Sequence, residues 1–584
     1  MIVKFSYLLK EALERYSAMQ ILNLAILMAF CVFSPVASQA PATEIEAKVN
    51  KIFEPWSKPD IPGAAVAIVQ DGRPLLVKGF GCADLEHNTP ITLETPFNAA
   101  SLAKQFTAFA VLMLDAQGKL SLDDDVRTYL PEFPDFGRKI TVRHLLYHTS
   151  GLRDWGGLML MSGNRMDDVF TSNAILKLIF RQQELNFEPG KEFAYCNAGY
   201  NVLAEIVART CGQSFKEWTR TNLFVPLGME RTTYKDDIRE LIPGSAQSYI
   251  RSGDGCFLRA LDNEAAPGPG SLFVSIKDMA SWMSTFQTKT VGTPEIWAKM
   301  FERGKLADGS TLPYAAGLIV GSYKRLPIFH HSGRWAGYGG EMVYFPKQSF
   351  AVAVLANNFS VDPTQLSRQI ANICLEGRFP PAQPRPSPLA EVDNKVLDAY
   401  VGRYWLRGEQ TVLIKRKENN LFAQISGDLP IKVFLESVDT FAYHIIDAKI
   451  QFHRKAPAKA HKITFWRGAV AISAERLPDE TWAPPTPEVF CGRYFSEELG
   501  IVLEVKIGEN GLYIPFIRRS DLHLIPIAKD KFAGQNSSAK FCFSRNDEGK
   551  ATELFFSMMD AWNVRFKRMG GNEAANSLLY VKDY

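Results

Sequence analysis

The chain is organised around Asn98-Ala99-Ala100-Ser101-Leu102-Ala103-Lys104-Gln105-Phe106. An apolar run follows to Leu114 and stops near Gly118, which predicts a buried helix that begins at Ser101. Positions i and i+3 share a helix face, so the Lys104 amine can reach the Ser101 hydroxyl. A serine becomes a nucleophile when a neighbouring base takes its proton, and the positive end of a helix favours an uncharged lysine and an oxyanion. The spacing therefore predicts a nucleophile, Ser101, with its activator, Lys104.

The Ser-x-x-Lys pattern alone fits a second interpretation, an N-capping serine beside a solvated lysine. Ser537-Ser538-Ala539-Lys540 has the same pattern in a polar turn that leads into a strand, where no helix would place the amine. The rest of the chain has to separate the two interpretations.

Strands are predicted at both ends of the first 380 residues, with helices between them. A single antiparallel sheet assembled from both ends, flanked by helices and carrying an inserted helical subdomain, fits this order and gives an α/β (α+β) fold. The cleft is expected where the predicted strands of the sheet end and the predicted helices begin, at Ser101. The predicted elements are helices at 43–56 and 363–375, helix starts near 122–126, 141–146 and 275–278, and strands at 64–69, 75–80, 315–320, 326–329, 341–345 and 351–355.

The C-terminal third is duplicated. Tyr400-Val401-Gly402-Arg403-Tyr404 recurs 90 positions later as Phe490-Cys491-Gly492-Arg493-Tyr494, and Phe452-His453-Arg454 recurs 91 positions later as Phe543-Ser544-Arg545. Each copy is rich in short strands, which predicts two small antiparallel β-barrel domains. The predicted boundaries are 41–378 for the first domain, 379–390 for a proline-rich linker, 391–478 for the first barrel, 479–487 for a second linker and 488–584 for the second barrel.

Composition excludes several classes of protein. A net charge of +3 on 584 residues gives no basic field, so nucleic acid is not expected as a partner. The eight cysteines form no close pairs, and the nine histidines show no metal-binding spacing. We therefore expect no disulfide framework, no metal site and no cofactor.

The first forty residues predict a signal peptide. Ile21 to Phe33 is an apolar run of 13 residues, and small residues around Ser38 offer a cleavage site before Pro41. The predicted location is therefore secreted or periplasmic, with no stable membrane span after cleavage. An uncleaved anchor is the alternative, and Met19 is a second possible start.

Two further segments carry candidate site residues. Tyr195 can act as a base toward Ser101 if a cation such as Lys104 holds it as a phenolate, since a free tyrosine has a pKa near 10. Asn197 can donate to a substrate carbonyl. The alternative is a core tyrosine beside a capping asparagine.

The other segment, His331-Ser332-Gly333-Arg334, ends a predicted strand. Gly333 would let a substrate approach the backbone, and the backbone N–H groups of Arg334 and Ser101 are the candidate oxyanion donors. His331 is expected either to bind the acyl group or to adjust the charge of the Tyr195–Lys104 pair. Its alternative is a half-buried strand histidine.

Ser-x-x-Lys, Tyr-x-Asn and His-x-Gly in this order resemble the class C β-lactamase and penicillin-binding superfamily of serine hydrolases. The resemblance covers about 42–378 and includes His148-Thr149-Ser150-Gly151-Leu152 and Phe187-Glu188-Pro189-Gly190. It implies a β-lactamase-like fold, Ser101 as the acylated nucleophile, Lys104 and Tyr195 as the acid/base pair, Asn197 as a substrate contact, and 331–333 on the strand that lines the site.

The third motif departs from the Lys-Thr-Gly of true β-lactamases. A neutral histidine is less suited than lysine to hold a substrate carboxylate, so strong β-lactam hydrolysis is not expected. The His-x-Gly form is similar to that of D-aminopeptidases and related esterases, and D-aminopeptidases also carry two β-barrel domains.

The expected function is an acyl-enzyme hydrolase acting on a small peptide, amide or ester, most simply a peptidase or amidase for D-amino-acid peptides. A carboxylesterase or weak β-lactamase is the alternative, and a non-catalytic binder of cell-wall peptides is the alternative of another class. The barrels are expected to narrow access to the cleft by projecting a loop into it. Deletion of 390–584 is expected to broaden or abolish substrate choice without removing Ser101 acylation.

Overall fold

A computed structural model describes residues 42–381, 393–406, 411–425, 430–443, 448–455, 457–467, 470–477, 486–535 and 537–570. The predicted signal peptide (1–40) lies outside these residues, as do most of the two predicted linkers. Within the described part of the chain, no helix combines the length and apolarity that a bilayer crossing requires.

A six-stranded antiparallel sheet forms the centre of the N-terminal domain (residues 42–378), as predicted. Its strands come from both ends of that domain, and β1 pairs with β15 from Ala64↔Ala356 to Gln70↔Phe350. The order is β12 (Ile319–Tyr323), β13 (Leu326–Trp335), β14 (Tyr338–Phe345), β15 (Phe350–Ala356), β1 (Ala64–Gln70) and β2 (Arg73–Phe80).

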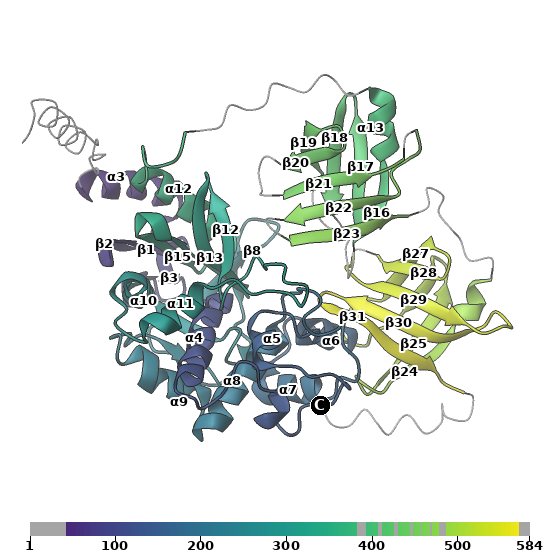
Figure 1. Cartoon of the computed structure of the whole chain (residues 1–584), viewed down its shortest axis with the longest axis horizontal. Helices are drawn as coiled ribbons and strands as arrows, with labels where there is room; N and C mark the ends of the chain where they lie inside the picture. The colour runs from purple at the N-terminus through teal and green to yellow at the C-terminus, as the bar shows by residue number, and fades with distance from the viewer. Residues whose placement is uncertain are drawn as a thin grey trace, which may run out of the picture.

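Both faces of this sheet are covered, which explains why β1 and β15 read as continuous apolar runs. Side chains alternate between faces along a strand, so Val66 and Val354 enter one core while Ala65 and Leu355 enter the other. Helices α3 (Ala42–Phe53) and α12 (Pro363–Cys374) cover the first face, and α10 (Ile276–Thr288) packs on the second (Figure 1).

The helical subdomain is inserted between β2 and β12 and supplies most of the site. Its helices are α4 (Ala103–Ala116), α5 (Val142–Leu146), α6 (Trp155–Met161), α7 (Ser172–Phe180), α8 (Asn197–Cys211), α9 (Phe215–Thr219), α10 and α11 (Pro294–Phe301). Its short strands are β3 (Cys82–Asp84), β4 (Thr89–Pro90), β5 (Pro96–Asn98), β6 (Phe170–Thr171), β7 (Thr233–Tyr234), β8 (Ser248–Arg251), β9 (Phe257–Ala260), β10 (Glu264–Ala265) and β11 (Leu272–Ser275).

The prediction of a strand at 315–320 is largely wrong, because β12 begins only at Ile319. Gly317 has a φ of +73° and its backbone presses against the backbone of Lys104, where a Cβ would lie 2.6 Å from the lysine carbonyl oxygen. The chain therefore turns at Gly317 to pass the nucleophile helix, and the strand starts after that turn.

The two predicted barrels are present, and each is closed by eight antiparallel strands. The first follows α13 (Asn394–Tyr400) and comprises β16 (Gly402–Leu406), β17 (Thr411–Lys417), β18 (Asn420–Ile425), β19 (Ile431–Ser437), β20 (Thr440–Tyr443), β21 (Ala448–His453), β22 (Lys462–Arg467) and β23 (Val470–Arg476). The second comprises β24 (Gly492–Ser496), β25 (Ile501–Gly508), β26 (Gly511–Ile514), β27 (Leu522–Ala528), β28 (Lys531–Gly534), β29 (Lys540–Arg545), β30 (Ala551–Met558) and β31 (Ala561–Arg568).

A shared packing arrangement explains the repeated Gly-Arg-Tyr sequence. In the second barrel the Arg568 guanidinium lies 5.7 Å from the ring centre of Tyr494 and fills the space that a Cβ on Gly492 would need. Arg476 stands in the same relation to Tyr404 and Gly402 in the first barrel. The glycine is needed because a larger residue would displace the arginine.

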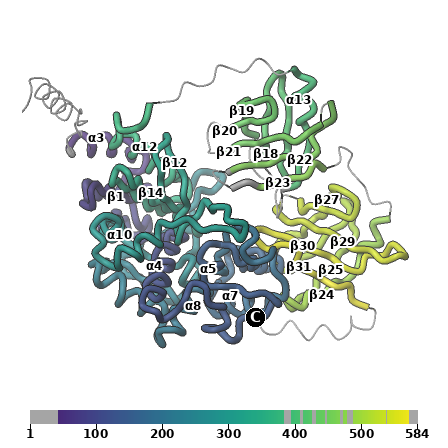
Figure 2. The backbone as a smooth tube through the Cα atoms, viewed as in Figure 1, coloured from purple at the N-terminus to yellow at the C-terminus, as the bar shows by residue number. Residues whose placement is uncertain are grey.

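The barrels differ in how they attach to the N-terminal domain. Buried apolar residues of the second barrel belong to one continuous cluster with those of the N-terminal domain, whereas the first barrel has a cluster of its own. Figure 2 shows the second barrel beside α6 and α7, with the first barrel above it. Lys540 of the second barrel lies 3.9 Å from the ring centre of Trp405 in the first.

Candidate active site

Ser101 lies at the start of the nucleophile helix, in a 3-10 turn (Ala100–Leu102) that leads into α4. Its side chain makes no capping bond; Asn98 Oδ1 instead accepts the Ala100 N–H at 2.9 Å. The interpretation of Ser101 as an N-capping serine is therefore wrong. Ala100 has a φ of +46°, an uncommon value for alanine, and Ser101 is partly exposed. A substrate can reach the hydroxyl.

Lys104 lies one turn later and is completely buried. Its Nζ is 3.1 Å from Ser101 Oγ, 2.7 Å from Asn197 Oδ1 and 3.1 Å from the Pro269 carbonyl oxygen. A neutral amine has two N–H groups and one lone pair, and of these three partners only the Ser101 hydroxyl can turn to donate. Once deprotonated, Lys104 therefore directs its lone pair at the nucleophile.

Burial makes that deprotonation accessible near neutral pH. Desolvation lowers the pKa of Lys104 to about 7, against the opposing effect of the Asp154 and Glu264 carboxyls. Burial also raises the pKa of Glu264 to about 8, with a further contribution from Asp262. Glu264 is therefore mostly uncharged at pH 7 and does little to hold the proton on Lys104.

Tyr195 lies opposite Lys104 and is hydrogen-bonded to Ser101, with the Lys104 Nζ 4.7 Å from its ring centre. Burial raises the pKa of Tyr195 well above 10, and the hydrogen bond to Ser101 offsets only part of that effect. The expectation of a phenolate base is therefore not met, since a buried amine nearby loses its proton first. With these pKa shifts, the arrangement suits Tyr195 to donating a proton and Lys104 to accepting one.

His148, which the sequence analysis quoted without a role, supports Tyr195. Its ring lies 4.5 Å from the Tyr195 ring, and its Nδ1 accepts the backbone N–H of Cys196 at 3.1 Å. The fully buried imidazole has a pKa well below 6.5 because of desolvation. It is a neutral support for the segment that carries the tyrosine.

Asn197, the first residue of α8, is held by a residue that the sequence analysis missed. Asp154 Oδ2 accepts the backbone N–H groups of Asn197 and, at 3.4 Å, of Ala198, and its Oδ1 caps α6. The Asn197 side-chain oxygen accepts a hydrogen bond from Lys104. The predicted contact of Asn197 to substrate can therefore come only from its side-chain amide nitrogen. An aspartate just before the apolar run of α6 was the available signal, a helix N-cap.

Strand β13 passes the nucleophile turn as predicted. A Cβ at position 333 would lie 2.4 Å from the Ala99 carbonyl oxygen and 2.9 Å from the Ser101 backbone nitrogen, so this position must be glycine. The Arg334 guanidinium donates to the carbonyl oxygens of Phe359 and Val361 at 3.1 and 3.2 Å. With its side chain engaged there, Arg334 can serve the site only through its predicted backbone N–H.

His331 is buried, and both ring nitrogens have partners. Nδ1 lies 2.7 Å from the Ser332 carbonyl oxygen, and Nε2 lies 3.3 Å from the Tyr314 hydroxyl. Burial and the nearby Lys104 lower the pKa of His331 to about 3. The imidazole is therefore neutral at any working pH and does not adjust the charge of the Tyr195–Lys104 pair, whereas contact with the acyl group stays a prediction.

The second barrel contacts the residues that surround the site. The two-residue turn between β30 and β31, Met559-Asp560, lies against the start of α6, where the Asp560 carbonyl oxygen accepts the Asp154 N–H at 3.1 Å and the Asn186 amide at 2.8 Å. The surrounding protein and the nearby Asp154 raise the pKa of the Asp560 carboxyl, although the exposure of this residue to solvent limits the effect of burial. This carboxyl is close enough to raise the pKa of Tyr195 as well.

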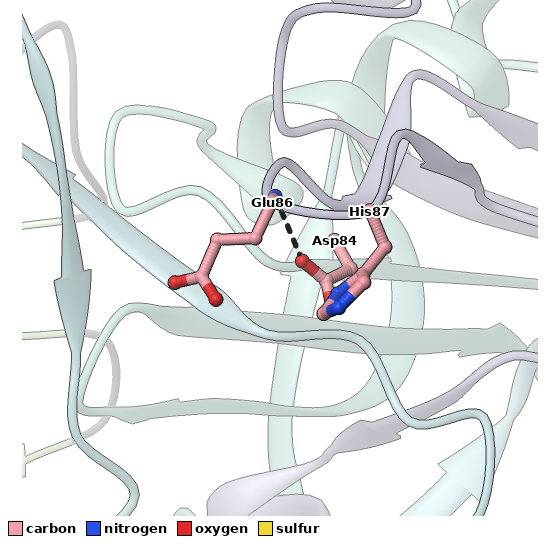
Figure 3. Close-up of side chains that lie close together, drawn as sticks. All are labelled: Asp84, Glu86 and His87. Atoms are coloured by element: carbon pink, nitrogen blue, oxygen red, sulfur yellow. Dashed lines mark hydrogen bonds and ion pairs between the residues drawn. The ribbon is translucent and has the colours of Figure 1, made fainter.

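Asp84, Glu86 and His87 form the one group of possible metal ligands among the described residues, with ligand atoms within 4.8 Å of one another (Figure 3). Asp84 accepts the Glu86 N–H at 2.9 Å and lies 2.8 Å from His87 Nδ1, while Glu86 faces Arg259. Asp84 is half-buried, Glu86 and His87 are exposed, and their polar atoms already have protein partners, so the group gives no reason to infer a cofactor. The seven cysteines in the described residues are unpaired.

Comparison with known proteins shows which family the chain is similar to. The family model described as Beta-lactamase matches residues 47–375. A D-aminopeptidase of Brucella anthropi is 24% identical over 87% of this chain and 95% of its own length. A penicillin-binding protein of Bacillus subtilis (strain 168) is 24% identical over 69% of this chain and 93% of its own.

Among solved structures, the octameric penicillin-binding protein homologue from Pyrococcus abyssi matches with a TM-score of 0.50 at 24% identity. The match covers 74% of this chain and 100% of that one. At this identity the match speaks for the fold alone.

Proposed function

The chain belongs to the Beta-lactamase family, and from that premise we propose that it is a serine hydrolase that works through an acyl-enzyme on Ser101. The observation that carries the proposal is the buried Lys104, whose amine touches two pure acceptors and the Ser101 hydroxyl. A protein that only binds cell-wall peptides would gain nothing from a lysine whose pKa is lowered toward neutral pH and whose amine contacts a serine hydroxyl.

The proposed reaction begins when neutral Lys104 takes the Ser101 proton as Oγ attacks the substrate carbonyl. The backbone N–H groups of Ser101 and Arg334 hold the oxyanion. Tyr195 donates its proton to the leaving nitrogen or oxygen and recovers one from the lysine ammonium. Water then attacks the acyl-serine with Lys104 again as base, which frees the acid and regenerates Ser101.

Within that class we propose an aminopeptidase for peptides and amides that begin with a D-amino acid, as the names of the relatives suggest. The Asp560 carboxyl, which is close enough to Tyr195 to raise its pKa, would serve as counter-charge for a free α-ammonium group, and a bound cation would in turn favour its charged form. Penicillins present an acylated amine and do not use such a carboxylate. We also propose export through the N-terminal segment, and esterase activity is the secondary candidate because the same acyl-enzyme accepts an ester.

The direct test is intact-mass analysis after exposure to a penicillin, a fluorophosphonate, a short-chain ester and a D-alanyl amide, with Ser101→Ala as the control. A Ser101-dependent adduct or turnover supports the acyl-serine mechanism, and the substrate that turns over fastest separates aminopeptidase from esterase. A folded protein that forms no adduct with any reagent would make the binder interpretation the better one.

Replacement of Asp560 by asparagine should lower kcat/KM about 10- to 100-fold for D-alanine p-nitroanilide, since a charge-assisted hydrogen bond to the substrate amine is lost. Hydrolysis of a short-chain ester without an amine should change less than about 2-fold. Asp547→Asn, at an exposed turn between β29 and β30, is the matched control. Equal losses on both substrates would contradict a role in amine recognition.

The value of kcat/KM for the amine-free ester should rise as the pH increases through about 7. The active form of Lys104 is neutral, so its fraction grows as pH passes its pKa of about 7, and kcat/KM should fall about tenfold per unit below pH 6. The pKa of Tyr195 lies well above 10, so no descending limb is expected below pH 9. A rate independent of pH between 5 and 8 would exclude Lys104 as the base.

A further inference from the structure

One end of the second barrel carries a half-open cavity that the proposed reaction does not use. Its volume is about 420 Å³, and its walls come from the β26–β27 loop, the β28–β29 turn and the end of β30. In an antiparallel barrel these segments lie at the same end as the β30–β31 turn, which reaches the N-terminal domain. The cavity is lined by Arg519, Ser520, Asp521, Leu522, His523, Gln535, Ser537 and Met558.

Arg519 is the notable member of this lining, because its guanidinium has no counter-charge. The group stacks on Phe516, 3.7 Å from the ring centre. Its Nε and Nη2 atoms are buried and have no hydrogen-bond partner among the residues that the structure describes. These two nitrogens form one edge of the planar group, the edge that pairs with both oxygens of a carboxylate or phosphate.

The neighbouring groups add donors. His523 Nδ1 is likewise buried and unpartnered within the described chain. Ser520, Gln535 and Ser537 supply hydroxyl and amide groups to the same walls. The Asp521 carboxyl also lines the cavity, but it is exposed and feels the charge of Lys506 rather than forming an ion pair with Arg519 in the described structure.

A guanidinium edge that is buried in the wall of this cavity without a partner needs a physical explanation, since buried polar groups are nearly always hydrogen-bonded. Desolvation alone lowers the pKa of Arg519, with no acidic neighbour to offset it. The stacking on Phe516 fixes the plane of the guanidinium before any ligand arrives, which lowers the entropic cost of a two-point contact. An oxyanion would satisfy both orphaned nitrogens at once.

We propose that this cavity is a binding site for an oxyanion, the carboxylate or phosphate group of a small ligand, held in two-point contact by Arg519 with His523 beside it. The site is separate from Ser101 and independent of the proposed hydrolysis. Its ligand would lie next to Met558, two residues before Asp560, and so beside the turn that contacts the start of α6.

The test is thermal unfolding and calorimetry of the full chain with acetate, succinate and inorganic phosphate as probes, each against sodium chloride of equal ionic strength. Wild type should gain on the order of 2 °C in Tm at saturating anion, since a ligand that binds the folded state stabilises it. The carboxylate and phosphate arms identify which oxyanion the site prefers.

Arg519→Gln should lose this stabilisation and weaken binding at least about tenfold, whereas Arg518→Gln should keep both. Arg518 is the matched control because it pairs with Asp168 at the adjacent position. In anion-free buffer Arg519→Gln should be at least as stable as wild type, because a buried charge without a partner is removed.

Arg519→Lys keeps the charge and loses the planar edge, so a folded protein with weakened anion binding would support the two-point contact even if Arg519→Gln fails to fold. No stabilisation of wild type by any probe, or equal stabilisation of wild type and both Arg519 variants, would overturn the proposal.

Discussion

Replacement of Lys104 by methionine should lower the rate of Ser101 acylation about 10²- to 10⁴-fold, which is the range for a lost general base. The residual rate should no longer rise through pH 7, because the group that titrates there is gone. Stopped-flow acylation with a chromogenic ester, followed by intact mass, measures both effects. The serine itself stays in place, so a slow Ser101-dependent adduct should still form.

Lys104→Arg separates the two roles that a lysine can have here. Arginine keeps the positive charge but cannot lose a proton in a protein, so it should be as inactive as methionine if Lys104 is a base. If Lys104 instead acts as a permanent cation, arginine should retain activity well above that of methionine. Near-wild-type acylation in Lys104→Arg would therefore contradict the proposed mechanism.

The contact between Ser101 and Lys104 could be predicted because it is local. Two residues three positions apart lie on the same helical turn, so neither tertiary structure nor homology is needed to predict their contact. Tyr195 and Asn197 reach the same point from more than ninety positions away. From the residues alone, a core tyrosine and a capping asparagine were also open interpretations. For these two, the resemblance of the ordered motifs carried the prediction.

The choice of base could not be predicted, because it depends on burial. In the sequence, Lys104 and Tyr195 have reference pKa values close to 10 and either can serve. Desolvation lowers the pKa of an amine and raises that of a phenol, so burying both separates their pKa values and makes the lysine the base. The neutral state of His331 follows from the same cause.

The fold was predictable where patterns are periodic and repeated. Alternating or continuous apolar runs marked most of the sheet strands, and the constant offset of 90 to 91 positions marked the two barrels. The docking of the second barrel was not predictable, since Arg153 and Glu498 are 345 positions apart and no local pattern links them. The Met559-Asp560 turn also lacks the glycine or asparagine that usually signals a hairpin.

Arg153 should be the most sensitive position outside the catalytic residues, because it fixes the second barrel to the active site. Its side chain is 1% exposed, and it forms an ion pair with Glu498, which is 5% exposed. It also donates to the carbonyl oxygens of Trp562 and Asn563 at 3.0 and 3.2 Å. All three partners belong to the second barrel.

A chain of contacts leads from this anchor to the nucleophile. Asp154, the next residue, donates its N–H to the Asp560 carbonyl and holds the backbone of Asn197 with its carboxylate. Asn197 in turn accepts from Lys104, which touches Ser101. Displacement of the barrel should therefore disturb the lysine base as well as the Asp560 turn.

Arg153→Met should destabilise the protein by about 3–5 kcal/mol, because it leaves the Glu498 carboxylate buried without its partner. It should also lower kcat on every substrate at least about tenfold, in contrast to Asp560→Asn, whose effect is confined to amine-bearing substrates. Urea unfolding and kinetics on the amide and ester pair measure the two effects. Arg138→Met, which breaks an exposed pair with Glu188, is the matched control and should cost less than about 1 kcal/mol.

Adding Glu498→Leu to Arg153→Met tests whether the charge or the geometry matters. An apolar pair should recover part of the stability, since no buried charge remains, whereas kcat should stay low because the contacts to Trp562 and Asn563 are still missing. Deletion of 390–584 is a poorer test than these variants, because the second barrel shares its core with the N-terminal domain and its removal would expose apolar surface. Wild-type kcat in a folded Arg153→Met protein would mean that the barrel merely rests on the domain and that the active site is complete without it.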